Sequence, residues 1–350
     1  MLCFRTDGNS SIGIGHIMRC LSIADAAKRL GEKSVFLVAS DDLKYTIKEH
    51  GHEVKILNTN YDNMNIELGQ TIAIISALNP VALFVDSYYV TNVYLDALRK
   101  LMKRIGSPLV YIDDVLSFSY PCDILINYNI YAAELDYRIL YMKKEIPRLL
   151  LGTRYAPLRA EFQNTPPRIV NKEGHNILIS TGGTDFEHIE LGLMEKIISK
   201  GKELKDLFFH FIIGSMNKDV EKIHILANKS NNIITYYNVS NISELMQSVD
   251  LAISAAGSTL YELCATKTAT ITYTLADNQI LGADCFSKFG VVKYIGDVRV
   301  LGVEELTEKL IVAAVNLANN YEERRLIAEE QYAIIDGKGA ERIIEKIKNL

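Results

Sequence analysis

A chain of 350 residues, 48% of them hydrophobic, is long enough to form two domains, each with its own core. Its net charge of −5 argues against a nucleic-acid groove, because such grooves need clustered Lys and Arg to displace the counterions of phosphates. We therefore expect a small-molecule ligand and no nucleic-acid partner.

In the first half of the chain, short apolar runs alternate with helical patterns. Strands are expected near residues 2–5, 34–39, 53–57, 82–86, 109–113 and 124–127, with helices between them. Repeated strand-helix units of this kind indicate a parallel sheet. Ligands of open parallel sheets bind beyond the carboxyl ends of the strands, so the turns that follow each strand are the places to search for chemistry.

The first of these turns contains Gly13 and Gly15 and ends at His16. The two glycines allow a ligand to approach the backbone closely, and the unpaired amides at the start of the next helix favour a bound anion. His16 is then well placed to move a proton beside that anion. No third glycine follows at the spacing of a dinucleotide fingerprint, so a nicotinamide enzyme is a poor fit.

Polar side chains also follow later strands of this half. Asp86, Ser87 and Tyr88 end one strand, and Asp113 and Asp114 end the next. Asp86 or Asp114 could orient His16 or an attacking water, and the alternative is that these acids cap helices.

The pattern restarts in the second half. Strands are expected near residues 176–180, 208–213, 233–237, 251–254, 269–274 and 292–295, and residues 321–350 read as helix, turn, helix. We expect an N-terminal Rossmann-like domain over 1–160, a linker over 161–174, and a second Rossmann-like domain over 175–320. Helices over 321–350 could pack back toward the first domain. The predicted fold is thus α/β, with two parallel-sheet domains facing each other across a cleft.

Three turns of the second half carry candidate ligand groups. Gly257, Ser258 and Thr259 open a helix and could hold a diphosphate, or they could simply cap the helix. Glu262 lies in the first turn of that helix, where an acid is also favourable without any ligand. We interpret Asn278 and Gln279 as loop residues that bind phosphate or sugar, with a structural turn as the alternative. The Thr181-Gly182-Gly183-Thr184 turn could close over a sugar or be only a tight turn.

Cysteine usage and hydropathy bear on the compartment. The five cysteines are scattered and have no Cys-x-x-Cys spacing, so neither a disulfide framework nor a zinc site is indicated. No run approaches the roughly 18 apolar residues of a membrane helix, and the charge of Arg5 comes too early for a secretion signal. The lysines are dispersed, which disfavours a basic membrane-docking face. We expect a cytoplasmic protein that does not bind membranes.

The residues that carry a family resemblance begin with Arg5-Thr6-Asp7-Gly8-Asn9 and continue with Gly13-Ile14-Gly15-His16-Ile17-Met18-Arg19-Cys20. Further matches lie at residues 85–88, 112–114, 151–159, 180–185, 256–263 and 276–279. Together they resemble the UDP-2,4-diacetamido-2,4,6-trideoxy-β-L-altropyranose hydrolases of pseudaminic acid biosynthesis. The later motifs are shared more widely with two-domain glycosyltransferases of the GT-B type. Residues 266–268 depart from the pattern, which has a small residue, Gly and Pro there.

The resemblance implies a GT-B fold and hydrolysis of a UDP-linked diacetamido sugar at its anomeric carbon, with UDP and free sugar as products. It also implies that no metal or organic cofactor is needed, that His16 is the general base for water, and that Glu262 accepts the ribose hydroxyls. We expect a monomer. The expected substrate- and UDP-binding residues are Gly13, Gly15, Asp86, Tyr88, Tyr155, Gly183, Val239, Gly257, Ser258, Thr259, Glu262, Asn278 and Gln279.

The residues themselves leave the proton role of His16 open. A helix N-terminus disfavours the imidazolium by about 0.3 to 1 kcal/mol. A diphosphate charge about 6 Å away, at an effective dielectric of about 20, favours the imidazolium by roughly 3 kcal/mol. His16 could therefore act as an acid beside the departing phosphate. Two other functions also stay open: a GT-B glycosyltransferase that uses a UDP-sugar donor, and a non-catalytic nucleotide-sugar sensor.

Overall fold

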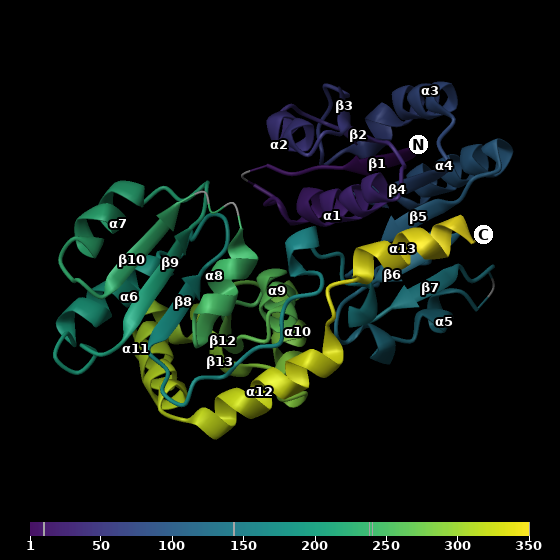
Figure 1. The fold of residues 1–350 in the computed structure, drawn as a ribbon. Helices are drawn as coiled ribbons and strands as arrows, with labels where there is room; N and C mark the ends of the chain where they lie inside the picture. Colours follow the sequence, from purple (N-terminus) through teal and green to yellow (C-terminus); the bar gives the residue numbers. More distant parts are fainter. Residues whose placement is uncertain (10, 143, 238, 240, 350) are drawn as a thin grey trace. The chain divides into compact units, whose positions relative to one another are not determined.

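The computed structural model describes residues 1–9, 11–142, 144–237, 239 and 241–349. The chain divides into two compact units (Figure 1). Unit 1 consists of residues Met1–Ala160 together with Lys338–Leu350, and unit 2 consists of Glu161–Gly337.

Unit 1 is built on a seven-stranded sheet whose strands all run parallel. The strands are β1 (Leu2–Thr6), β2 (Ser34–Val38), β3 (Glu53–Ile56), β4 (Ala82–Asp86), β5 (Leu109–Ile112), β6 (Ile124–Asn127) and β7 (Arg148–Leu151). The helices are α1 (Gly15–Arg29), α2 (Lys44–Glu49), α3 (Leu68–Leu78), α4 (Asn92–Ile105), α5 (Tyr137–Leu140) and α13 (Gly339–Lys348), with short 3-10 turns η1 (Met64–Glu67), η2 (Ala132–Glu134), η3 (Thr153–Tyr155) and η4 (Ala160–Phe162).

Unit 2 is built on a six-stranded sheet, again parallel throughout. Its strands are β8 (Asn176–Ser180), β9 (Phe208–Ile213), β10 (Ile233–Tyr237), β11 (Leu251–Ala255), β12 (Ala269–Thr274) and β13 (Lys293–Asp297). Its helices are α6 (Ile189–Ser199), α7 (Val220–Ala227), α8 (Ile242–Ser248), α9 (Thr259–Ala265), α10 (Asp277–Lys288), α11 (Val298–Ala318) and α12 (Tyr321–Ile334).

The strand order places a switch point at the same position in each sheet. The order is β3-β2-β1-β4-β5-β6-β7 in unit 1 and β10-β9-β8-β11-β12-β13 in unit 2. The chain therefore changes direction across the sheet between β1 and β4, and again between β8 and β11. Ligands of doubly wound sheets bind outside the carboxyl ends of the strands at such a point. The turns that follow β1, β4, β8 and β11 carry most of the residues singled out in the sequence.

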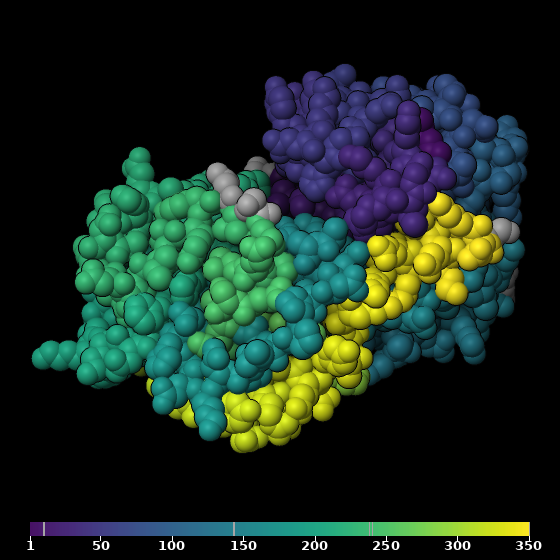
Figure 2. All heavy atoms as spheres, viewed as in Figure 1, coloured from purple at the N-terminus to yellow at the C-terminus, as the bar shows by residue number. Residues whose placement is uncertain are grey.

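Both faces of the central strands are covered. Every residue of β1, β2 and β4 is buried, which explains why most residues of these strands are apolar. On one face of the unit 1 sheet, the ring of Phe4 stacks between Phe36 and Phe84, at centroid distances of 4.9 and 4.6 Å. The C-terminal helix α13 packs against α1 and η3. Figure 2 shows the yellow spheres of this helix against the purple N-terminal segment.

Two features of the fold differ from the sequence-based expectation. Strand β7 is absent from the predicted set because its four residues lie at the sheet edge, where they are only partly buried. Such a short run after a proline carries little periodic signal. In addition, Asn278 and Gln279 were expected in a loop, but α10 begins at Asp277 and includes both. The first turn of α10 contains neither Gly nor Pro, and an acid in that turn favours the helix.

Lys267 occupies a backbone conformation that favours glycine. Its φ is +56°, immediately after α9, at the position where the family pattern has Gly. The Lys267 ammonium lies 4.6 Å from the centroid of the Tyr332 ring. We expect Lys267→Gly to have a free energy of unfolding about 1 kcal/mol higher than Lys267→Ala, because both lose the ring contact and only Ala keeps the strained Cβ. Urea unfolding of the two variants checks this, and greater stability of the Ala variant would contradict it.

Glu190 is a fully buried acid in the first turn of α6. Its carboxyl oxygens accept hydrogen bonds from Thr181 Oγ1 and Asn217 Nδ2, each at 2.7 Å. Burial, together with the nearby Asp185 carboxylate, raises the pKa of Glu190 to about 8. Because the pKa of Glu190 is raised in the folded state, the contribution of this group to stability is present at acidic pH. The contribution is lost as the pH rises from the ordinary pKa of a glutamate to about 8.

Glu190→Gln should therefore flatten the fall in the free energy of unfolding between about pH 5 and about pH 9. Gln keeps the shape of the side chain and cannot ionise. Urea unfolding at both pH values measures the slope, with the exposed Glu195→Gln as the matched control on the same helix. An unchanged slope in Glu190→Gln would show that Glu190 does not titrate in this range.

Among the described residues, no helix combines the length and apolar character needed to cross a membrane.

Candidate active site at the switch point of unit 1

The turn between β1 and α1 sets the position of His16. Asn9 Oδ1 accepts hydrogen bonds from the backbone N–H groups of Ser11 and Ile12, at 2.8 and 3.0 Å. Asn9 also forms an antiparallel bridge with Gly13, whose φ of +75° requires glycine. The chain can then enter α1 at Gly15, and His16 falls in the first turn of the helix, beside the end of β4.

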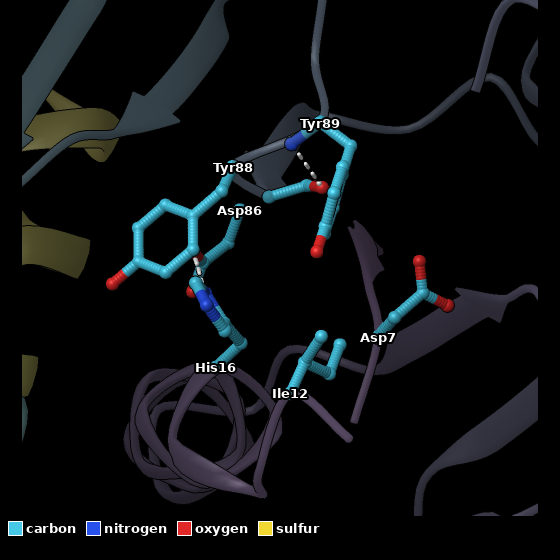
Figure 3. A pocket seen from close by; sticks show the side chains of 7 residues that line it. Asp7, Ile12, His16, Asp86, Tyr88 and Tyr89 are labelled. Carbon is cyan, nitrogen blue, oxygen red and sulfur yellow. Dashed lines mark hydrogen bonds and ion pairs between the residues drawn. The ribbon is translucent and has the colours of Figure 1, made fainter. Parts of the chain in front are cut away.

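His16 is paired with the carboxylate that ends β4. Its Nδ1 lies 2.7 Å from Asp86 Oδ1, and both side chains are buried (Figure 3). Burial opposes ionisation of Asp86, but the Arg19 guanidinium and His16 hold the pKa of Asp86 well below its usual range. Since an ionised carboxylate can only accept, Nδ1 carries the proton and donates it to Asp86. In the neutral imidazole, the lone pair is then on Nε2.

Arg19 completes this pair from the next turn of α1. Its Nε lies 2.6 Å from Asp86 Oδ2 and its Nη2 lies 2.5 Å from Oδ1, which is a bidentate contact. Arg19 Nη2 is also 3.0 Å from His16 Nδ1. Both nitrogens donate to Asp86 Oδ1, so we interpret their proximity as the result of sharing this acceptor. No role was predicted for Arg19, although the i, i+3 spacing puts it on the same face of the helix as His16.

A second carboxylate links Arg19 to Tyr88. Asp114 Oδ2 accepts hydrogen bonds from Arg19 Nη1 and from the Tyr88 hydroxyl, each at 3.0 Å. The Tyr88 ring meets His16 edge to face, with the ring centroids 4.5 Å apart. Burial and the neighbouring Asp114 raise the pKa of Tyr88, so its hydroxyl keeps its proton and donates. His16 is thus held by a closed set of contacts through Asp86, Arg19, Asp114 and Tyr88.

A hollow of about 200 Å³, counting the solvent at its mouth, opens beside His16. The side chains around it come from the turns after β1 and β4 (Figure 3). They are Asp7, Ile12, His16, Asp86, Ser87, Tyr88 and Tyr89.

The structure brings some of the predicted unit 1 residues together and leaves one apart. His16, Asp86 and Tyr88 are in contact, and Gly13 and Gly15 lie in the turn that leads to His16. Asp86 was expected to bind substrate or to orient His16 or a water, and its two oxygens accept hydrogen bonds from His16 and Arg19, which is the arrangement that orienting His16 requires. Tyr155 lies in η3, beneath the Arg154 guanidinium and next to α13, and does not line the hollow.

In unit 2, the turn after β11 leads directly into α9. Ser258 precedes the helix and is exposed, and its hydroxyl does not cap the helix. Gly257 has open space where a Cβ would lie. Thr259 and Glu262 are half-buried in the first turn. The capping alternative therefore has no support at Ser258, and the turn presents hydroxyl and amide groups at the switch point of this sheet.

The remaining predicted residues of unit 2 lie around the same edge. Gly183 follows β8, and its carbonyl accepts a hydrogen bond of 3.1 Å from the backbone N–H of Met216. In α10, Asn278 is exposed, whereas Gln279 Oε1 accepts a hydrogen bond of 2.8 Å from the backbone N–H of Leu275. Gln279 thus has at least one structural bond. Val239 is half-buried after β10, and residues 238 and 240 are outside the described residues.

No three or more His, Cys, Asp or Glu side chains within the described part of the chain are arranged to hold a metal ion.

The fold is shared with known structures. The MurG protein of Acinetobacter baumannii superposes with a TM-score of 0.66 over 100% of this chain and 99% of its own, at 14% sequence identity. The chain has the GT-B fold. Residues 176–336 of this GT-B chain match the glycosyltransferase family 28 C-terminal domain.

Curated relatives cover most of the chain at low identity. The UDP-2,4-diacetamido-2,4,6-trideoxy-β-L-altropyranose hydrolase of Campylobacter jejuni is 26% identical over 261 residues, which are 74% of this chain and 86% of that protein. An uncharacterized protein of Methanocaldococcus jannaschii is 27% identical over 267 residues, which are 73% of this chain. The match spans only 52% of the length of the Methanocaldococcus protein.

Proposed function

We propose that this chain is a nucleotide-sugar enzyme that hydrolyses a UDP-linked 2,4-diacetamido-2,4,6-trideoxy sugar at its anomeric carbon. The products are UDP and the free sugar, as a step of pseudaminic acid biosynthesis. The resemblance of the opening motif and the Campylobacter jejuni relative support this substrate. The observation that carries the reaction type is the 2.7 Å contact between His16 Nδ1 and Asp86, because it leaves Nε2 as a proton acceptor.

In the proposed step, His16 Nε2 takes a proton from water while the water oxygen attacks the anomeric carbon. The bond from that carbon to the phosphate oxygen breaks, and the electron pair leaves with UDP. Asp86 stabilises the imidazolium that forms and keeps the ring in one tautomer, as carboxylates do in other His-dependent hydrolases. Arg19 and Asp114 hold Asp86 and Tyr88 in place.

Binding of the nucleotide is assigned to the turns of unit 2. The N-terminal amides and hydroxyls at Ser258 and Thr259 suit a diphosphate, and Glu262 suits the ribose hydroxyls. Gly183, Gly257 and Asn278 border the same strand ends and are proposed to contact UDP.

The alternative is a GT-B glycosyltransferase with a UDP-sugar donor, which the match to family 28 favours. The two functions differ in their need for an acceptor. The experiment incubates chelator-treated protein with the UDP-linked diacetamido sugar and follows UDP release with and without candidate acceptor sugars. We expect steady release without an acceptor. Release that occurs only with an acceptor would establish transfer and overturn the hydrolase proposal.

Glu262→Ala should weaken UDP binding more than it slows the bound reaction. Loss of one buried charge-assisted contact of this kind costs about 1.5 to 3 kcal/mol, which is roughly a tenfold to hundredfold rise in Kd. Calorimetric titration with UDP measures Kd, and single-turnover kinetics at saturating substrate measures the chemical step. Glu244→Ala, on another helix of unit 2, is the control. An unaltered UDP affinity in Glu262→Ala would return Glu262 to a structural role.

A further inference from the structure

The hollow beside His16 is small. Its volume of about 200 Å³ includes the open mouth, so the enclosed part is much smaller than this. The hollow can therefore hold one substituent of a ligand, with the rest of the ligand outside it.

The two carboxylates and the Ser87 hydroxyl oxygen in its wall are already paired within the protein. Asp7 accepts a hydrogen bond of 2.7 Å from the backbone N–H of Ala39 and pairs with Arg5. Asp86 is paired with His16 and Arg19, and Ser87 Oγ accepts a hydrogen bond of 3.2 Å from the backbone N–H of Tyr89. Almost all of the lining surface that remains is apolar.

Ile12, Tyr88 and Tyr89 supply this apolar wall, and the structure fixes each of them. The Ile12 N–H is bound to Asn9, and the Tyr89 ring meets Tyr61 edge to face at a centroid distance of 5.4 Å. Tyr88 is held by Asp114 and packs on His16. Figure 3 shows Ile12 and Tyr89 on opposite sides of the space next to His16. The shape of the hollow is thus formed before a ligand arrives.

A preformed apolar space of this kind suits a methyl group better than a water molecule. A buried water needs two to four polar partners, and beyond His16 Nε2, where the attacking water is proposed to bind, this wall offers few. A hydroxyl placed there would likewise lose its hydrogen bonds to solvent without replacement.

We propose that this hollow receives one methyl group of the sugar and that Ile12 and Tyr89 are specificity-determining residues. The methyl group is either the one at C6 of the deoxy sugar or the one of an acetamido group. This inference rests on the proposed function, since it takes a UDP-linked sugar as the ligand.

The test compares the substrate with two analogues, one bearing a hydroxyl at C6 and one with N-glycolyl in place of N-acetyl groups. Each analogue turns one kind of methyl group into a hydroxymethyl group. We expect kcat/KM for one of the two analogues to fall by about 10- to 200-fold, the usual range for a change of this size in an apolar pocket. The analogue that is rejected identifies which methyl group enters the hollow.

Ile12→Thr should lower this discrimination by about tenfold, because it adds a hydroxyl to the wall without adding bulk. Ile12→Val, which keeps the wall apolar, is the matched control and should stay within about threefold of the original ratio. Tyr89→Leu provides a second variant on the opposite wall and should also lower the ratio. All variants should bind UDP alone as the unmodified protein does.

The same ligands are compared by calorimetry, so that discrimination is measured whether or not the sugar bond breaks. Equal affinity and equal kcat/KM for the substrate and both analogues would overturn the inference, as would an unchanged ratio in both Ile12→Thr and Tyr89→Leu. Discrimination in binding without acceptor-free UDP release would instead contradict the proposed hydrolysis and leave the inference standing.

Discussion

His16→Asn should lower the turnover of UDP-sugar hydrolysis by about 10²- to 10⁴-fold, the usual contribution of a general acid or base. Asn can still accept or donate a hydrogen bond at this position, but it cannot exchange a proton with water. The UDP affinity should stay within about twofold, because the nucleotide contacts are assigned to unit 2. Steady-state kinetics and UDP titration on the same preparation measure the two quantities.

His50→Asn is the matched control for this variant. His50 Nδ1 lies 2.6 Å from Asp25 Oδ2, so it is also a histidine paired with a carboxylate in unit 1, but it follows α2 and does not line the hollow. The turnover of the His50→Asn variant should equal that of the unmodified protein. If His16→Asn also retained full turnover, His16 would have no part in the reaction.

Asp86→Asn should reduce both turnover and stability. A carboxamide can present an N–H to Nδ1, which favours the wrong tautomer of His16 and can cost up to about 10⁴-fold in turnover. Arg19 would lose its buried counter-charge, and breaking such a pair costs about 3 to 5 kcal/mol of the free energy of unfolding. Turnover and urea unfolding of the purified variant measure the two losses.

Asp114→Asn is the control for the loss of charge. Asp114 also pairs with Arg19, but 17% of its side chain is exposed, so the loss of stability should be less than half as large.

The stability difference caused by Asp86→Asn should also depend on pH. Because the pKa of Asp86 is lowered in the folded state, its contribution to the free energy of unfolding is present above its ordinary pKa and is lost as the pH falls. The stability difference between Asp86→Asn and the unmodified protein should therefore shrink below about pH 4. A difference that is constant with pH, or equal losses in both variants, would contradict this account of the pair.

The sequence predicted most of the fold because each central strand is a continuous apolar run bounded by a turn. It also identified the turn at Gly13 and His16, since the two glycines and the following helix are local features. It could not choose between Asp86 and Asp114 as the partner of His16, because residues 70 positions apart meet only through the order of strands β1 and β4 in the sheet.

Two smaller points show where local rules succeeded and failed. Residues 266–268 depart from the family pattern, and the structure has Lys267 in the left-handed region at the position where the pattern has Gly. The expectation of a loop at Asn278 and Gln279 was wrong because polar residues after a strand suit a helix start as well as a loop. Arg19 was overlooked as a functional residue because arginines on helices are commonly solvent-exposed.

The measurement that tests the central claim most directly is hydrolysis in water labelled with oxygen-18, without an acceptor. The proposed reaction breaks the bond between the anomeric carbon and the phosphate oxygen, so the label should be found in the released sugar and not in UDP. Mass spectrometry of both products, read before the free sugar exchanges its anomeric oxygen with solvent, gives the answer. Label in the β-phosphate of UDP would mean attack at phosphorus, and would contradict the account of His16 as the group that directs water to the anomeric carbon.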